Sequence, residues 1–117
     1  MEPEIFALAE YLNACGAKIK GVGSPVIVIE GVDRLNGGKF TVIPDRIETG
    51  TFAIMAAAAR APLTITKCCP AHIESLLAIF RKIGIAYEAG PDWLKIMAAK
   101  KFKSYNIKTH EYPGFPT

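Results

Sequence analysis

Apolar residues near the start of the chain recur at the spacing of one helix face. Ile5, Leu8 and Leu12 lie three or four residues apart, and Pro3 and Gly16 flank them. Because proline suits the first helical turn and glycine the position just past the end, this stretch predicts a helix. Two strand-like runs follow, AKIKGVGS and VIVIEG, joined across a turn at residues 23–25.

The next segment passes from an apolar run to a charged helix start. The run KFTVIP, residues 39–44, predicts a buried strand. Asp45 then has the place and the side chain of a helix N-cap. Its carboxylate can accept the amide of Glu48, and Glu48 can reach back to the amide of Asp45, as in a capping box. The alanine-rich helix is expected to end near Arg60, because Pro62 opposes its continuation.

Strands and a helix alternate over the second half of the chain. PLTITKC predicts a strand, and a helix is expected from Pro70 to just before Gly84, with one apolar face. IAYEAG and WLKIMA predict a strand pair, and KSYNIKT one more extended run. This order of elements predicts an α/β fold.

The first and third helical stretches are similar to each other at a fixed offset. Ile73 lies 68 residues after Ile5 (73 − 5), and at this offset Gly16 aligns with Gly84, Val26 with Leu94 and Val28 with Ile96. An internal repeat of the βαβαββ type explains a stop glycine and two strands in step. We therefore expect residues 1–38 to be the second half of one repeat, residues 39–99 a complete βαβαββ repeat, and residues 100–117 an extended segment that leads toward the next repeat.

Composition indicates a globular chain of modest charge. Half of the 117 residues are hydrophobic, 21% are charged, and the net charge is +3. These values argue against disorder, and the sequence shows neither an export leader nor a run long enough to span a membrane. Several lysines gather in the last third: Lys95, Lys100, Lys101, Lys103 and Lys108. They fit either a solvated face or a surface for an anionic partner.

The polar candidates for chemistry are few. The three cysteines, Cys15, Cys68 and Cys69, have no CxxC spacing, and with two histidines in the chain a zinc site is not expected. Cys69, at a helix start, is either a lowered-pKa nucleophile or a structural thiol, and His72 is expected to face solvent. Capping already explains Asp45 and Glu48. Arg46 has no local explanation, because a cation in a first helical turn opposes the helix dipole.

Four stretches carry a resemblance to a known family. EPEI at the start, PDRIETGTF in the middle and YPGFPT at the end, together with the turn IEGVDRLNGG, resemble the bacterial UDP-N-acetylglucosamine 1-carboxyvinyltransferases. The resemblance runs along the whole chain. It implies a two-domain enzyme built from βαβαββ repeats with its site between the domains. The implied reaction transfers enolpyruvyl from phosphoenolpyruvate to UDP-N-acetylglucosamine in the first committed step of peptidoglycan synthesis, in the cytoplasm, with no metal or cofactor.

The resemblance also sets what to expect of this chain itself. The family's reactive-cysteine loop and its lysine–asparagine pair have no counterpart here, and the family's FPT is followed by a catalytic aspartate, whereas this sequence ends at Thr117. We therefore expect an internal piece of the enzyme, inactive alone, without catalytic residues of its own. Thr117 and Arg46 are the expected substrate-contacting residues, and Asp45 and Glu48 the cap of a helix corner at the cleft.

Two further interpretations concern partners. A freestanding βαβαββ module that binds RNA or a protein is the alternative, supported by the lysines alone. For the enzyme piece, neither nucleic acid nor a membrane is an expected partner. A repeat separated from its neighbours exposes apolar faces, which favours self-association.

Overall fold

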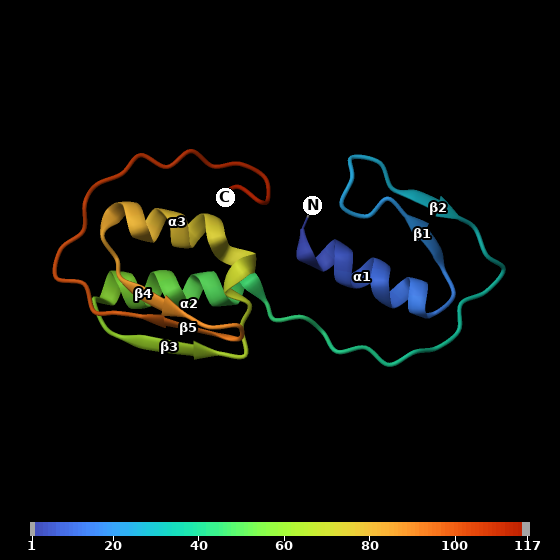
Figure 1. Ribbon diagram of the computed structural model, residues 1–117, viewed down its shortest axis with the longest axis horizontal. Helices are drawn as coiled ribbons and strands as arrows, with labels where there is room; N and C mark the ends of the chain where they lie inside the picture. Colours follow the sequence, from blue (N-terminus) through green and yellow to red (C-terminus); the bar gives the residue numbers. More distant parts are fainter. Residues whose placement is uncertain (1, 116–117) are drawn as a thin grey trace. The chain divides into compact units, whose positions relative to one another are not determined.

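The computed structural model describes residues 2–115, and the chain forms two compact units whose boundary along the sequence lies between Ile43 and Pro44. The first unit contains helix α1 (Pro3–Ala14) and the strands β1 (Lys18–Lys20) and β2 (Val28–Glu30). The second contains α2 (Arg46–Ala59), β3 (Leu63–Thr66), the 3-10 turn η1 (Pro70–Ile73), α3 (Glu74–Ile83), β4 (Tyr87–Ala89) and β5 (Trp93–Ile96) (Figure 1). The predicted α/β class is confirmed.

The first unit is a helix beside a two-stranded hairpin. β1 and β2 pair antiparallel, with Ile19 opposite Ile29. Gly16 follows α1 with a φ of +100°, a conformation that favours glycine, as expected of a residue just past a helix end. Asn13 ties the helix to the hairpin, because its side chain both accepts from the Ile19 amide and donates to the Ile19 carbonyl.

The second unit is a three-stranded antiparallel sheet with two helices on one face. The strand order is β3-β5-β4, so β3 and β4 run parallel to each other on either side of β5. Leu94 and Ile96 of β5 are fully buried and form one cluster with Ala53 of α2 and with Leu77 and Phe80 of α3. Alternate residues of a strand point to the same face, so α2 and α3, which both pack on Leu94 and Ile96, cover that face.

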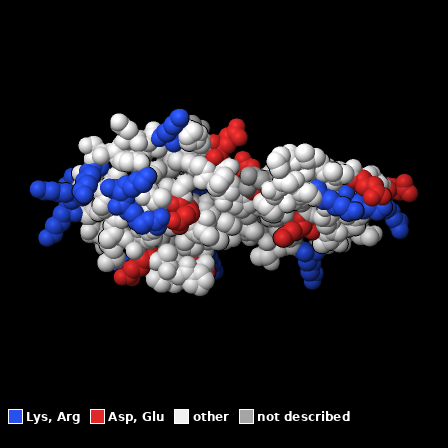
Figure 2. All heavy atoms as spheres, turned by 45° about the horizontal axis from the view of Figure 1, so that its top comes forward, with Lys and Arg blue, Asp and Glu red and all other residues white. Residues whose placement is uncertain are grey.

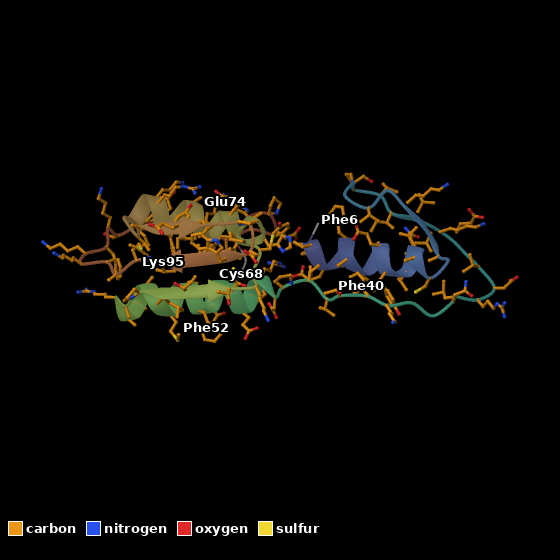
Figure 3. All side chains as sticks on the ribbon, turned by 60° about the horizontal axis from the view of Figure 1, so that its bottom comes forward. Phe6, Phe40, Phe52, Cys68, Glu74 and Lys95 are labelled. Carbon is orange, nitrogen blue, oxygen red and sulfur yellow. The ribbon has the colours of Figure 1, made fainter. Side chains whose placement is uncertain are left out.

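The predicted strand at residues 39–44 is wrong, since these residues form no strand. The segment instead returns along α1 (Figures 1 and 3). The Asn36 amide donates to the Cys15 carbonyl at 2.7 Å, and the rings of Phe40 and Tyr11 lie 5.4 Å apart. Residues 39–99 therefore lack the first strand of a βαβαββ repeat. The sheet has three strands rather than four, and KSYNIKT likewise forms no strand.

The segment after β5, residues 100–115, contains neither helix nor strand and passes along the outside of α3 before it turns at its end (Figure 1). We call it the C-terminal segment. The Lys103 amide donates to the Ile83 carbonyl at 3.0 Å, and the Lys82 ammonium donates to the Tyr105 hydroxyl at 2.8 Å. Arg60, the residue that caps the end of α2, lies over the ring of Phe102 at 5.5 Å. These contacts attach the segment to both helices.

Candidate functional site

The start of α2 is built around one carboxylate. Oδ1 of Asp45 accepts the amides of Ile47 at 2.8 Å and Glu48 at 3.0 Å, which would otherwise have no helical partner. The carbonyl of Asp45 accepts from both the amide and the hydroxyl of Thr49, at 3.1 and 2.7 Å. The predicted cap at Asp45 is therefore confirmed.

The reciprocal half of the predicted capping box is wrong. Among residues 2–115, no hydrogen bond joins the Asp45 amide to the carboxylate of Glu48. Glu48 instead adds a negative charge in the first turn of α2, where the helix dipole favours it. The Glu48 carboxylate is exposed, so water can satisfy it without a hydrogen bond to the Asp45 amide.

Arg46 lies against an aromatic ring from the other end of the chain. Its guanidinium carbon is 4.9 Å from the centre of the Tyr112 ring. A guanidinium at this distance is attracted by the negative face of the ring. Arg46 thus has an aromatic neighbour that the sequence interpretation did not anticipate.

Arg46 and Tyr112 border a cavity of about 300 Å³ within the second unit. Its lining is mainly apolar and comes from α2, from η1 with the start of α3, and from the C-terminal segment: Arg46, Ile47, Gly50, Thr51, Ile54, His72, Ile73, Ser75, Leu76, Tyr112 and Phe115. At Gly50, an added Cβ would lie 3.5 Å from a methyl group of Leu76, which is an ordinary contact distance. A concave, mostly apolar surface with a few polar groups is the usual form of a small-molecule binding site.

His72 is placed differently from its prediction. It is half-buried rather than solvent-facing, and its Nδ1 atom is fully buried without a hydrogen-bond partner in the part of the chain that the structure describes. A buried polar atom of this kind is costly unless a partner satisfies it. His72 therefore joins Arg46 among the polar groups at this cavity.

The two cap-region carboxylates border a second hollow of about 230 Å³. Asp45 and Glu48 line it together with residues of β3 and with Lys67 and Cys68. The charges of the corner are thus divided: Arg46 borders the apolar cavity, and Asp45 and Glu48 border the smaller hollow. Thr117, the other expected substrate contact, lies outside the described residues.

The cysteines show no arrangement for catalysis in the described residues. Cys15 and Cys68 are buried, and burial raises the pKa of the Cys68 thiol, which disfavours the nucleophilic thiolate. Cys69 is half-buried at the N-cap position of η1, where its side chain makes no capping bond. Residues 2–115 contain no group of three His, Cys, Asp or Glu side chains placed to hold a metal ion.

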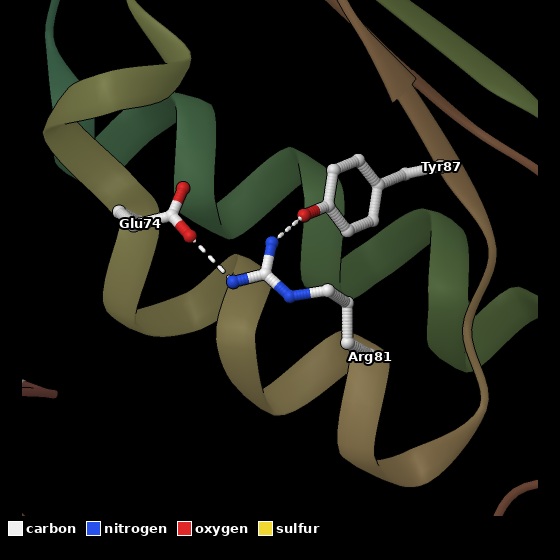
Figure 4. Close-up of polar contacts among 3 residues, drawn as sticks. All are labelled: Glu74, Arg81 and Tyr87. Carbon is white, nitrogen blue, oxygen red and sulfur yellow. Dashed lines mark hydrogen bonds and ion pairs between the residues drawn. The ribbon is translucent and has the colours of Figure 1, made fainter.

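A polar cluster on α3 has a structural role. Arg81 donates to Glu74 at 2.5 Å and also to the hydroxyl of Tyr87 on β4 (Figure 4). The Glu74 carboxylate raises the pKa of Arg81, which therefore stays charged. The cluster joins both ends of α3 to the strand that follows.

The lysines of the last third lie mostly on exposed chain. Lys100, Lys101, Lys103 and Lys108 are exposed in the C-terminal segment, and Lys95 on β5 lies 4.0 Å from Glu88. Figure 2 shows Lys and Arg side chains gathered toward the left-hand end of the second unit. No helix among the described residues is long and apolar enough to cross a membrane.

Comparison with known proteins assigns the chain to a class of enzymes. Residues 1–117 match the family model of EPSP synthase (3-phosphoshikimate 1-carboxyvinyltransferase), and the chain belongs to this family. Within it, the chain is 45% identical to the UDP-N-acetylglucosamine 1-carboxyvinyltransferase of Hamiltonella defensa subsp. Acyrthosiphon pisum (strain 5AT), 47% to that of Photobacterium profundum and 48% to that of Shewanella sp. (strain ANA-3).

These similarities cover nearly all of this chain but a small part of the relatives. Each extends over 117 residues, which is 99% of the chain and 28% of the relative's length. The resemblance carried by EPEI, PDRIETGTF and YPGFPT is thereby confirmed. The freestanding binding module is not favoured, because the whole chain matches a transferase family.

Proposed function

We propose that this chain is one part of a bacterial UDP-N-acetylglucosamine 1-carboxyvinyltransferase. The complete enzyme would transfer the enolpyruvyl group of phosphoenolpyruvate to UDP-N-acetylglucosamine and release phosphate. This reaction would take place in the cytoplasm as the first committed step of peptidoglycan synthesis, on which cell-wall biogenesis and cell shape depend. The observation that carries the proposal is the 45–48% identity to enzymes of this name over 99% of the chain. No metal or cofactor is part of the proposal.

The contribution of this part is structural support for the substrate site. Asp45 caps the helix α2, and Arg46 is the first residue of that helix. Arg46 lies against Tyr112, which precedes Thr117 by five residues in the sequence. Under the proposal, Thr117 contacts substrate directly. Because the chain covers 28% of its relatives, the groups that carry out the chemistry come from the remainder of the enzyme, and the 117-residue chain alone is inactive.

A graft tests the proposal directly. This chain would replace the matching segment of the Shewanella sp. (strain ANA-3) relative, to which it is 48% identical over 117 residues. Phosphate release from phosphoenolpyruvate would be measured with and without UDP-N-acetylglucosamine. We expect turnover that depends on the sugar nucleotide in the graft, and none from the isolated chain.

Two results would contradict the proposal. One is a folded graft, verified by circular dichroism, that neither binds nor turns over UDP-N-acetylglucosamine. The other is salt-sensitive RNA binding by the isolated chain, which would favour the lysine-based alternative, since phosphate contacts release counterions. The control is the unmodified Shewanella enzyme, assayed under the same conditions.

Self-association belongs to the same proposal. Apolar side chains of the first unit are exposed on its helix, its hairpin and the following segment, among them Ile5, Phe6, Leu8, Val26, Val28, Ile29 and Val42. Large exposed apolar surfaces promote association in water. We propose that the isolated chain self-associates through these faces and binds neither nucleic acid nor membrane.

A further inference from the structure

The end of the described chain folds into a tight turn. The Gly114 amide donates to the Glu111 carbonyl at 2.7 Å, and the His110 amide donates to the Phe115 carbonyl at 2.9 Å. These two bonds close residues 110–115 into one loop. Tyr112 lies at its bend and is half-buried.

Two aromatic rings attach this turn to the helices. Tyr112 and Phe115 both line the 300 Å³ cavity whose other walls are α2 and the start of α3. Phe115 packs against the buried cluster of the second unit. The face of the Tyr112 ring meets the guanidinium of Arg46 at 4.9 Å.

The rest of the C-terminal segment is attached well upstream of the turn. Its contacts with the helices at Phe102, Lys103 and Tyr105 all precede the turn by several residues. The Arg46–Tyr112 pair is therefore the cation–ring contact that acts on the turn itself. Arginine suits this role better than lysine, since its planar guanidinium stacks on an aromatic face.

We propose that Arg46 is a positioning residue that holds the turn at residues 110–115 by stacking on Tyr112. Through this contact, Arg46 fixes Tyr112, and with it the turn, against the start of α2. The inference rests on the proposed function for its enzymatic meaning, since Thr117, the proposed substrate contact, follows the turn in the sequence. It explains why a cation occupies the first turn of α2, where the helix dipole opposes it.

The test reads the order of the turn in the 117-residue chain. Backbone ¹⁵N relaxation would be recorded for Gly114 and Phe115 in the wild type and in Arg46→Gln, Arg46→Lys, Tyr112→Leu and Tyr112→Phe. We expect order parameters of about 0.85 in the wild type, and values below about 0.6 in Arg46→Gln and Tyr112→Leu. Tyr112→Phe keeps the ring face and should retain the wild-type value, whereas Arg46→Lys should fall between.

A matched control tests whether the loss of any arginine–ring contact disorders the turn. Arg60→Gln removes the other arginine–ring pair, with Phe102, and should leave Gly114 and Phe115 ordered. The amide of the fully buried Ala53 reports whether each variant is folded. If Arg46→Gln does not fold, the two tyrosine variants decide the question.

Unchanged order at Gly114 in both Arg46→Gln and Tyr112→Leu would overturn the inference. So would disorder in Arg46→Gln together with full order in Tyr112→Leu, because Arg46 would then act through another partner. In the active graft, Arg46→Gln should lower kcat/KM for UDP-N-acetylglucosamine about tenfold, and Arg60→Gln should not. An inactive graft would count against the proposed function alone, since the relaxation experiment does not depend on turnover.

Discussion

At Asp45, a single carboxylate oxygen accepts two amides at the start of α2. The first four amides of a helix have no partner within it, so this oxygen supplies half of what the helix start requires. The neighbouring Glu48 contributes charge rather than a hydrogen bond to the chain. Asp45 is therefore the side chain whose hydrogen bonds stabilise the free amides at the start of α2.

Replacing Asp45 should therefore lower the stability of the chain. We expect Asp45→Ala to lower the free energy of unfolding by about 1 kcal/mol, because two amides lose their acceptor. Asp45→Asn should cost much less, since an amide oxygen can cap in the same way. Urea denaturation of both variants would measure the difference. Asp33→Ala, in an exposed loop, is the matched control, and equal losses in all three variants would contradict the cap.

Sequence predicted the residues of this corner better than their partners. The cap could be predicted because Asp45 and the amides it accepts are neighbours along the chain. The position of Arg46 against Tyr112 could not, since 66 residues (112 − 46) separate them and only the fold brings them together. The buried Nδ1 of His72 was missed for the same reason, because the cavity around it is formed by distant segments.

At the scale of elements, local signals identified the helices, and the lack of a partner explains the failed strand. Pro3, Asp45 and Gly84 mark helix ends through short-range geometry, and the observed helices agree with them. The run at residues 39–44 has the composition of a strand, but a strand needs a neighbour to pair with its backbone. In the first unit, β1 and β2 pair with each other, and the run packs on α1 instead.

The end of α3 provides a test of backbone geometry. Gly84 has a φ of +89°, and a Cβ added there would meet no atom within 4 Å. Gly84→Ala should therefore destabilise by conformation alone, by roughly 0.5–1 kcal/mol after the entropy that alanine removes from the unfolded chain. Gly37→Ala, also in open space but without a positive φ, is the control and should be neutral or slightly stabilising. Thermal melts that rank the two variants equally would contradict this account.

At the scale of the whole molecule, two pairs of strand residues that align at the 68-residue offset differ in burial. Leu94 and Ile96 are 0% exposed, whereas their counterparts Val26 and Val28 are 65% and 58% exposed. The second unit covers its face with α2 and α3, and the described part of the first unit contains one helix, α1. The 68-residue repeat stays a prediction, and the different burial of the two aligned stretches follows from the elements that accompany each of them.

This asymmetry predicts unequal stability along the chain. Among residues 2–43 of the first unit, the buried apolar side chains are Ala7, Ala9 and Cys15, whereas the second unit buries a continuous cluster that includes Leu77 and Phe80. Because local opening is easiest where few apolar contacts must be broken, the amides of α1 should exchange with solvent at least tenfold faster than those of α3, after correction for intrinsic rates. Hydrogen exchange followed by NMR at several protein concentrations would measure both. Exchange in α1 that slows as concentration rises would show self-association of the exposed apolar faces. Equal protection of α1 and α3 at the lowest concentration would contradict the prediction.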